Sequence, residues 1–134
     1  MNHWLVKSEP IKYSWEKFLK EGKTTWDGVR NYAARNNLRS MKKGDLVLFY
    51  HSNEGLSVVG IAKVAKEAFQ DPTTQDINWV AVELVPFKTF KKPVSLAQIK
   101  ADEKLQNIYL VRQGRLSVMP LKKEEFDHIL KLGV

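Results

Sequence analysis

The chain contains no cysteine. This absence excludes disulfides, thiolate metal sites and a cysteine nucleophile together, and it fits a reducing compartment. Histidine is also scarce. The chain has three histidines, and they stand far apart in sequence, at positions 3, 51 and 128. No HExxH pair, glycine-rich phosphate loop or GxSxG motif occurs. We therefore expect neither a metal ion nor a cofactor.

Long apolar runs are missing as well. No stretch approaches the ~18 residues of a membrane-spanning helix, and the first ten residues lack the basic-then-apolar pattern of a signal peptide. We expect no membrane partner and a cytoplasmic protein in a prokaryote, or a nuclear one in a eukaryote. With 134 residues and an ordinary hydrophobic content of 43%, the chain predicts one globular domain over 1–134.

Positive charge is present in excess and is unevenly placed. The chain carries 22 basic and 15 acidic residues, a net charge of +7, and residues 1–51 hold ten of the basic and five of the acidic ones. A basic face attracts polyanions such as nucleic acid, chiefly without sequence specificity. A lysine-rich, solvated surface explains the charge equally well, so the charge alone does not decide the partner.

The pattern of apolar residues predicts an α+β fold in which strands outweigh helices. Apolar runs predict strands at 4–6, 46–50, 58–66 and 79–85. Helices are predicted from the N-cap Ser14 to Gly22, from near Gly28 to Lys42 or Lys43, from the N-cap Ser95, and after Pro120. Gly44 occupies the position expected just beyond the second helix. We expect these elements to form a small, partly closed, mixed β-barrel with flanking and inserted helices.

The segment 25–52 is the most informative part of the chain. Three of the five arginines and an aromatic residue at each end fall within one predicted helix and one predicted strand. A helix that only covers a core does not need so many directional hydrogen-bond donors, whereas a planar polar ligand such as a nucleobase does. Trp26 offers a rigid face for stacking a base, although a core position explains a tryptophan too. Gly28 beside it would let the backbone approach a ligand closely.

The polar residues of this segment cannot all serve one pocket. Asn31, Arg35 and Arg39 recur at four-residue spacing and share one helix face, whereas Arg30 lies well around the helix from Arg39. We expect Arg30, nearest to Trp26, to face the ligand. Arg35 and Arg39 would then face solvent, phosphate or acidic structural partners.

Two predicted strands end in polar residues that could rim a pocket. Tyr50-His51-Ser52 closes one of them, and Lys7-Ser8-Glu9 closes another. His51 could contact a base edge, act in catalysis, or be a satisfied structural residue. Lys7 and Glu9 could face the cavity or pair at the surface.

Several motifs in fixed order resemble the EVE domain family of the PUA-like superfamily. They span nearly the whole chain: WLVKSEP at 4–10, TWDGVRN at 25–31 with ARN at 34–36, Gly44-Asp45, Tyr50-His51-Ser52, VGIA at 59–62, Asp71-Pro72, KPV at 92–94 and RLSVMP at 115–120. The resemblance implies a PUA-like β-barrel with a pocket suited to a modified base. It also implies relatedness to YTH domains, which hold a methylated adenine in an aromatic cage, and to ASCH domains. EVE proteins are linked to modified cytosines in DNA, including 5-methylcytosine.

The resemblance also implies roles for individual residues. The implied walls of the cage are Trp26 and Tyr50, with Gly28 and Val29 in the same ligand-binding set. Polar contacts would come from Ser8, Arg30, Asn31, His51 and Ser52, and the far side of the pocket from Leu116 and Ser117. The basic charge of residues 1–51, rather than the resemblance, suggests contacts with the nucleic-acid backbone, from Lys7, Arg35, Arg39 and Lys42.

Three functions remain open from the sequence. The first is a non-catalytic reader of a modified base in DNA or RNA, acting as a monomer. The second is a small hydrolase of modified nucleosides, because ASCH relatives use Lys, Ser or Thr, and Glu, the types found at positions 7–9. Adjacent strand residues point to opposite faces, however, so these three converge only if the strand breaks at Ser8. The third is an interaction protein with a vestigial pocket.

Overall fold

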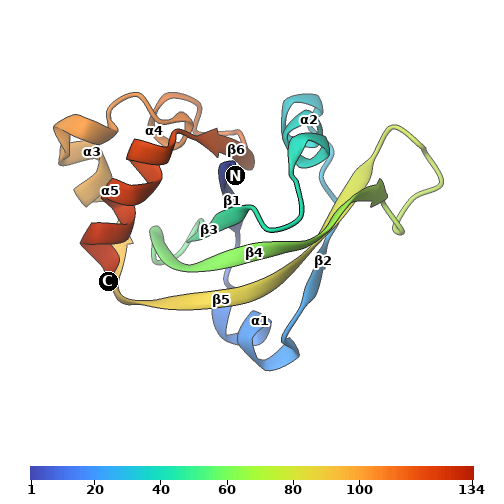
Figure 1. Ribbon diagram of the computed structural model, residues 1–134, viewed down its shortest axis with the longest axis horizontal. Coiled ribbons are helices and arrows are strands. Elements are labelled where there is room, and N and C mark those ends of the chain that lie inside the picture. Colours follow the sequence, from blue (N-terminus) through green and yellow to red (C-terminus); the bar gives the residue numbers. More distant parts are fainter.

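One mixed sheet of six strands forms the centre of the computed structural model, which describes residues 1–134 (Figure 1). The strand order is β2-β5-β4-β3-β1-β6. β1 and β3 pair in parallel, and all other neighbours pair antiparallel. The strands are β1 (His3–Ser8), β2 (Thr24–Trp26), β3 (Leu46–His51), β4 (Ser57–Gln70), β5 (Val80–Ser95) and β6 (Val118–Leu121).

The two parallel strands carry the centre of the core. Trp4–Val6 of β1 and Val47–Tyr50 of β3 are buried over consecutive residues, so both faces of these strands are covered. This agrees with the apolar runs in the sequence, which are typical of strands without a solvent face. β4 and β5 are much longer and curve strongly (Figure 1). Their pairing shifts register four times, as bulges that bend a sheet do.

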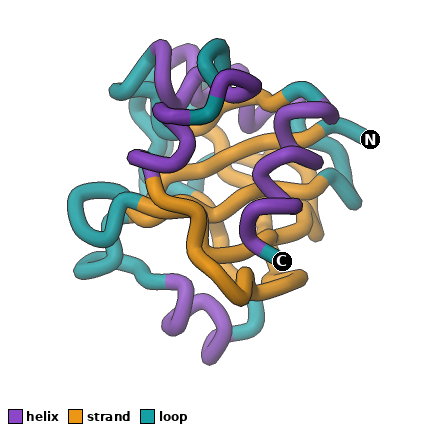
Figure 2. The backbone as a smooth tube through the Cα atoms, turned by 90° about the vertical axis from the view of Figure 1, so that its left-hand side faces the viewer, coloured by secondary structure: helices purple, strands orange, loops and turns teal.

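Five α-helices and one short 3-10 turn (Glu103–Leu105) surround the sheet. Figures 1 and 2 show α1 on one side of the sheet and the other helices elsewhere around it. The helices are α1 (Trp15–Glu21), α2 (Tyr32–Ser40), α3 (Leu96–Ala101), α4 (Tyr109–Arg112) and α5 (Lys123–Gly133). None of them is long and apolar enough to cross a membrane.

The predicted caps of two helices are confirmed. The Ser14 side chain accepts a hydrogen bond from the backbone N–H of Lys17, and Gly22 ends α1 at φ +75°. Ser95 and Gln98 form the predicted capping box at the start of α3. Serine side chains satisfy N–H groups that the first helical turn leaves free, which is why these positions are readable from sequence.

The predicted bounds of the second helix are wrong at both ends. α2 begins at Tyr32 rather than near Gly28, because the side chain of Asn31 accepts from the N–H of Ala34 and Gly28 has φ +75°. Residues 27–31 are therefore a loop between β2 and α2. The helix ends at Ser40, so Gly44 is not its C′ residue but belongs to the turn that enters β3.

Candidate functional site

A cavity of about 530 Å³ opens between the end of β1, the strand β2 and the loop 27–31. It brings together eight of the predicted ligand-binding and backbone-contacting residues, from three separate segments of the chain. The backbone N–H of Lys7 donates to the carbonyl of Ser117, which holds two of these segments side by side. The lining consists of Lys7, Ser8, Glu9, Lys12, Tyr13, Thr24, Thr25, Trp26, Asp27, Gly28, Val29, Arg30, Asn31 and Ser117.

Trp26 is half-buried and forms an aromatic wall of this cavity. β2 pairs with β5, which places Trp26 opposite Val82. The indole ring packs edge-on against Phe49, with 5.6 Å between ring centroids, and against Tyr13 at 6.4 Å. Its Nε1–H has no hydrogen-bond partner within the protein, and it is not sealed from solvent. The ring is thus fixed in place while its donor stays available to a ligand.

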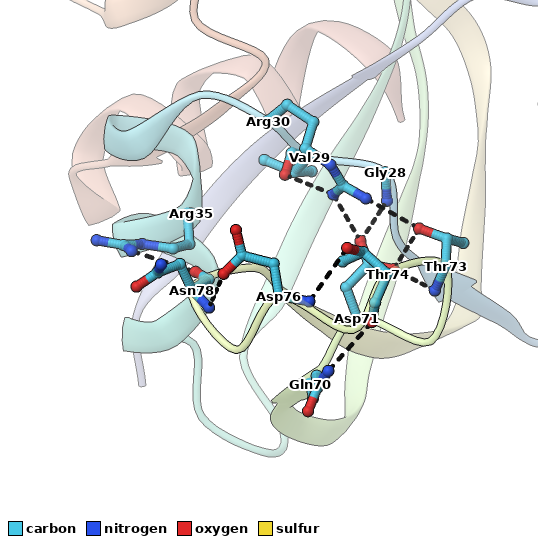
Figure 3. Close-up of polar contacts among 10 residues, drawn as sticks. All are labelled: Gly28, Val29, Arg30, Arg35, Gln70, Asp71, Thr73, Thr74, Asp76 and Asn78. Carbon is cyan, nitrogen blue, oxygen red and sulfur yellow. Dashed lines mark hydrogen bonds and ion pairs between the residues drawn. The ribbon is translucent and has the colours of Figure 1, made fainter.

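A carboxylate that is not part of the cavity lining holds the loop 27–31 (Figure 3). Asp71 is fully buried, and its Oδ2 accepts from the backbone N–H of Gly28 at 2.8 Å and from Nη1 of Arg30 at 2.9 Å. Its Oδ1 accepts from the backbone and the hydroxyl of Thr73. One buried charge therefore fixes both the backbone and a side chain of the cavity wall.

These contacts decide the ionisation of Asp71. Burial alone would raise the pKa of this carboxyl. The hydrogen bonds from Thr73, from Arg30 and from the N–H of Gly28 outweigh burial and lower the pKa to about 2. Asp71 is therefore a carboxylate at any physiological pH.

Arg30 lines the cavity as predicted, but most of its donors are already engaged. Nη1 donates to Asp71 and to the carbonyl of Val29, and Nη2 donates to Thr73 Oγ1 at 3.0 Å. The guanidinium also lies 5.5 Å from the ring centroid of Trp79. With five N–H groups and three of them bonded here, Arg30 acts mainly as a brace of the loop.

Two further ionisable groups in the cavity lining have shifted pKa values. Burial, together with the negative charge of Asp71, raises the pKa of the Asp27 carboxyl. Burial also raises the pKa of Tyr13 to about 12, and its hydroxyl donates to Glu21 at 2.8 Å. Tyr13 therefore stays neutral, and Asp27 is a carboxyl without a strong cationic partner.

The polar residues at the end of β1 all line the cavity, because the strand ends at Ser8. Their functional groups bond elsewhere, however. The Lys7 ammonium donates to the carbonyl of Gly114, the Ser8 hydroxyl donates to the carbonyl of Tyr13, and Glu9 pairs with Lys12. Burial lowers the pKa of Lys7. No bond joins the lysine, the serine and the glutamate to one another.

Four predicted ligand-binding residues do not reach this cavity. Tyr50 is only 2% exposed and, with Ser52, lines a separate cavity of about 260 Å³ that shares Lys7 with the first. His51 Nε2 accepts from the N–H of Trp15 at 3.0 Å, and burial lowers the pKa of this imidazole, so it caps α1. Leu116 is buried in the core.

Of the four predicted backbone-contacting residues, Lys7 lies on β1 and lines the cavity, and the other three lie on and after α2. Arg35 hydrogen-bonds to Asn36 and to the carbonyl of Asn78, and Arg39 and Lys42 are exposed. None of these three side chains forms an ion pair. Their positive charge is therefore free to attract a polyanion.

Sequence reasoning missed several residues of the site. Thr25, Asp27 and Asp71 stand inside motifs that were noted for the resemblance, so the signal was present but carried no role. Tyr13 and Thr24 had no such signal. Tyr13 lies at the cavity with its ring packed against Trp26 of β2, a tertiary contact that local patterns do not encode.

Comparison with known proteins gives a consistent result. The family model of the EVE domain matches residues 2–132. Human thymocyte nuclear protein 1 is 36% identical over 165 residues, covering 98% of this chain and 73% of that protein. An uncharacterized protein of Schizosaccharomyces pombe is 27% identical and covers 98% of this chain and 68% of its own length.

Solved structures agree with these relatives. A crystal structure of a protein from Agrobacterium tumefaciens has a TM-score of 0.98 at 46% identity, over 99% of this chain and 93% of that one. The human THYN1 protein, solved in complex with 5-methylcytosine containing DNA, has a TM-score of 0.92 at 35% identity, over 98% and 97%. The ZmASCH protein of Zymomonas mobilis shares the fold at 13% identity and a TM-score of 0.62. The fold is thus α+β and PUA-like, as the sequence predicts.

Proposed function

The chain belongs to the EVE domain family, and from this we propose that it is a non-catalytic reader of a modified base in a nucleic acid. The base would occupy the cavity beside Trp26. The observation that supports this proposal most strongly is the Trp26 ring. It packs against Phe49 and Tyr13 and keeps an unpartnered N–H at a cavity large enough for a base.

A related structure and the chemistry of the cavity indicate which nucleic acid and which base would bind. The human THYN1 protein was solved with DNA containing 5-methylcytosine, which supports a modified cytosine in DNA as the ligand here. Asp27 in the cavity lining supports the same base, because a carboxylate is a matched acceptor for the exocyclic amino group of cytosine. RNA is the other possible carrier, and a modified base in RNA would also suit this cavity.

The cavity has to distinguish both the base and its modification. Burying one methyl group gains only ~0.8 kcal/mol, about fourfold in affinity. Hydrogen bonds must therefore fix the identity of the base, and the apolar surface of Trp26 and Val29 would recognise the methyl group. A base taken from a duplex must also leave its stack, which costs a few kcal/mol. Contacts of Arg35, Arg39 and Lys42 with phosphates would offset that cost.

Hydrolysis is the weaker proposal. A nucleophile needs a base within hydrogen-bond reach, whereas Ser8 donates to the carbonyl of Tyr13 and Lys7 to the carbonyl of Gly114. Glu9 pairs with Lys12 rather than with either of them. These bonds support binding without catalysis.

The proposal is tested by fluorescence anisotropy of labelled strands that differ in one base. The strands carry cytosine, 5-methylcytosine, 5-hydroxymethylcytosine or N6-methyladenine in an otherwise identical sequence, in DNA and in RNA, at low and moderate salt. We expect one modified base to bind best at both salt concentrations, and we expect Trp26→Ala to remove that preference.

A matched control separates the cavity from the remaining surface. Tyr109 is an exposed aromatic residue on α4 that lines neither cavity, so Tyr109→Ala should bind like the unaltered protein. Equal affinity for all four bases in the unaltered protein would rule out a reader. Turnover of an acylated cytidine that depends on Lys7 would favour the hydrolase.

A further inference from the structure

Two aromatic rings pack against each other in a tilted arrangement at the surface next to the cavity. Tyr32, the first residue of α2, and Trp79, the last residue before β5, have ring centroids 5.0 Å apart and an angle of 32° between their planes. Tyr32 nevertheless keeps 60% of its surface exposed. Trp79 is half-buried. Residues 47 positions apart in the chain thus form a joint aromatic surface.

Arginine side chains flank this aromatic pair. The guanidinium of Arg30 lies 5.5 Å from the Trp79 ring centroid, and that of Arg35 lies 4.9 Å from the Tyr32 ring centroid. Figure 3 shows the two arginines at opposite ends of the loop that carries Asp71 and Asn78. Asp71 neutralises Arg30, whereas Arg35 forms no ion pair.

The hydrogen bonds of Arg35 are easily exchanged. They go to the side chain of Asn36 and to the carbonyl of Asn78, and both of these residues are exposed. Water can satisfy such acceptors at little cost when the arginine turns to a phosphate. The nearest acid in the loop sequence, Asp76, accepts from the backbone N–H of Asn78.

This surface is continuous with the cavity. Arg30 belongs both to the cavity lining and to the aromatic cluster, and Asn31 in the lining directly precedes Tyr32. A strand that places one base in the cavity therefore has its neighbouring nucleotide within reach of Tyr32. Aromatic rings beside cationic side chains are the usual means of holding single-stranded nucleic acid without sequence preference.

We propose that Tyr32, Trp79 and Arg35 form a platform for the nucleotide adjacent to the one in the cavity. Its base stacks on the exposed part of the Tyr32–Trp79 pair, and Arg35 contacts its phosphate. This assignment rests on the proposed function, because it places the strand through the base held beside Trp26. Stacking on the platform gives affinity for a strand but no discrimination of the modification.

The test compares Tyr32→Ala with the unaltered protein on three probes. These are the free nucleoside 5-methyl-2′-deoxycytidine, a five-nucleotide DNA strand with 5-methylcytosine at its centre, and the same strand with cytosine. We expect Tyr32→Ala to weaken binding of both strands about 5- to 150-fold, the range for one stacked base, and to leave the nucleoside affinity unchanged. Tyr109→Ala is the matched control, with no expected loss on any probe.

Salt separates the two parts of the platform. The loss caused by Tyr32→Ala should persist from 0.15 to 0.5 M salt, whereas the loss caused by Arg35→Gln should shrink, since added salt weakens phosphate contacts. Equal strand affinities of Tyr32→Ala and the unaltered protein, including no binding by either, would overturn the platform. A parallel loss on the free nucleoside would also overturn it, because Tyr32 would then act on the cavity.

The two proposals fail in different ways. If the unaltered protein binds both strands alike and ignores the nucleoside, while Tyr32→Ala weakens both strands, the reader fails and a strand-binding platform remains. If the nucleoside binds and the strands are indifferent to Tyr32→Ala, the reader stands without its platform. In that second outcome, the surface formed by Tyr32, Trp79 and Arg35 would be a contact surface for a protein partner rather than for a nucleotide.

Discussion

At the residue scale, the cavity wall depends on a side chain outside the cavity. Asp71 reaches back 43 positions to the N–H of Gly28 and 41 positions to the Arg30 guanidinium. The Asp71-Pro72 pair was visible in the sequence, but its partners were not, because nothing local links it to the loop 27–31. The sequence could therefore place Arg30 at the cavity but could not show that its guanidinium braces the loop.

The lowered pKa of Asp71 predicts acid sensitivity. A carboxyl whose pKa falls from 3.8 to about 2 on folding stabilises the fold above pH 4, and this stabilisation is lost as the pH falls toward 2. The shift corresponds to about 2 kcal/mol. We expect the difference in unfolding free energy between the unaltered protein and Asp71→Asn to shrink by this amount between pH 5 and pH 2 in urea denaturation.

The control for this pH series removes a charge from the same loop. Asp76→Asn alters an exposed carboxylate, so its difference from the unaltered protein should stay much smaller than that of Asp71→Asn at pH 7. A difference for Asp71→Asn that does not change with pH would contradict the assigned ionisation.

Gly28 predicts a second effect at this scale. Its φ of +75° favours glycine, and a Cβ there would meet no atom within 4 Å, so Gly28→Ala adds backbone strain without a clash. We expect a loss of about 1 kcal/mol in unfolding free energy and weaker ligand binding, because the strain falls on the cavity wall. Gly114→Ala also meets open space, but without a positive φ, and should be nearly neutral in the same measurements.

At the scale of elements, long apolar runs and capped helices were predictable, and short or irregular elements were not. β2 has three residues and β6 contains Pro120, so neither shows the alternation that indicates a strand. β6 lies at the sheet edge and pairs only with β1, a position in which proline is tolerated. The residues of β2 nevertheless hold Trp26, so the aromatic wall stands on an element that periodicity could not detect.

The same limit applies to the start of α2. Helical spacing extended the predicted start of the helix back to Gly28. In the structure the N-cap of α2 is Asn31, three residues after that glycine. The consequence is functional, because the residues between them form the cavity wall instead of a helix turn.

The docking of α1 onto the sheet gives a prediction for these elements. A Cβ on Gly60 of β4 would lie 2.3 Å from Cζ2 of Trp15, whose Nε1 donates to Thr89 of β5. We expect Gly60→Ala to destabilise the fold by about 1–3 kcal/mol, because the buried indole must move. Urea denaturation checks this value.

The double variant Gly60→Ala with Trp15→Phe shows whether the collision is the cause. A smaller ring leaves room for the new methyl group, so the double variant should lose less than the sum of the two single losses. Additive losses would show that the indole is not what opposes the methyl group.

At the scale of the whole molecule, the net charge of +7 and its excess in residues 1–51 were readable from the sequence, but which of these charges are paired was not. Arg30 is neutralised by a buried partner, whereas Arg35 and Arg39 on α2 carry no ion pair. Free positive charge is thus retained on α2. The predicted α+β, PUA-like fold is confirmed. It could be predicted because the order of apolar strands is a property of the whole chain rather than of one motif.

This distribution predicts the salt dependence of strand binding. Removing one phosphate contact lowers the slope of log K against log salt by about one. We expect this change in slope for Arg35→Gln and for Arg39→Gln, measured by anisotropy at salt concentrations from about 50 to about 200 mM. Arg112→Gln is the matched control: Arg112 bonds to Gln106 and Asn107 and lines neither cavity. An unchanged slope for Arg35→Gln and Arg39→Gln would place the strand elsewhere.

The most direct measurement for the central claim is a titration with free nucleosides, which carry no phosphate and can sense only the cavity. 5-Methyl-2′-deoxycytidine and 2′-deoxycytidine are added at moderate salt while tryptophan emission is followed, with the unaltered protein and with Trp26→Phe. We predict quenching by both nucleosides, at least about fourfold tighter binding of the methylated one, and loss of the quenching in Trp26→Phe. Equal binding of the two nucleosides, or quenching that persists in Trp26→Phe, would contradict a modified-base site beside Trp26.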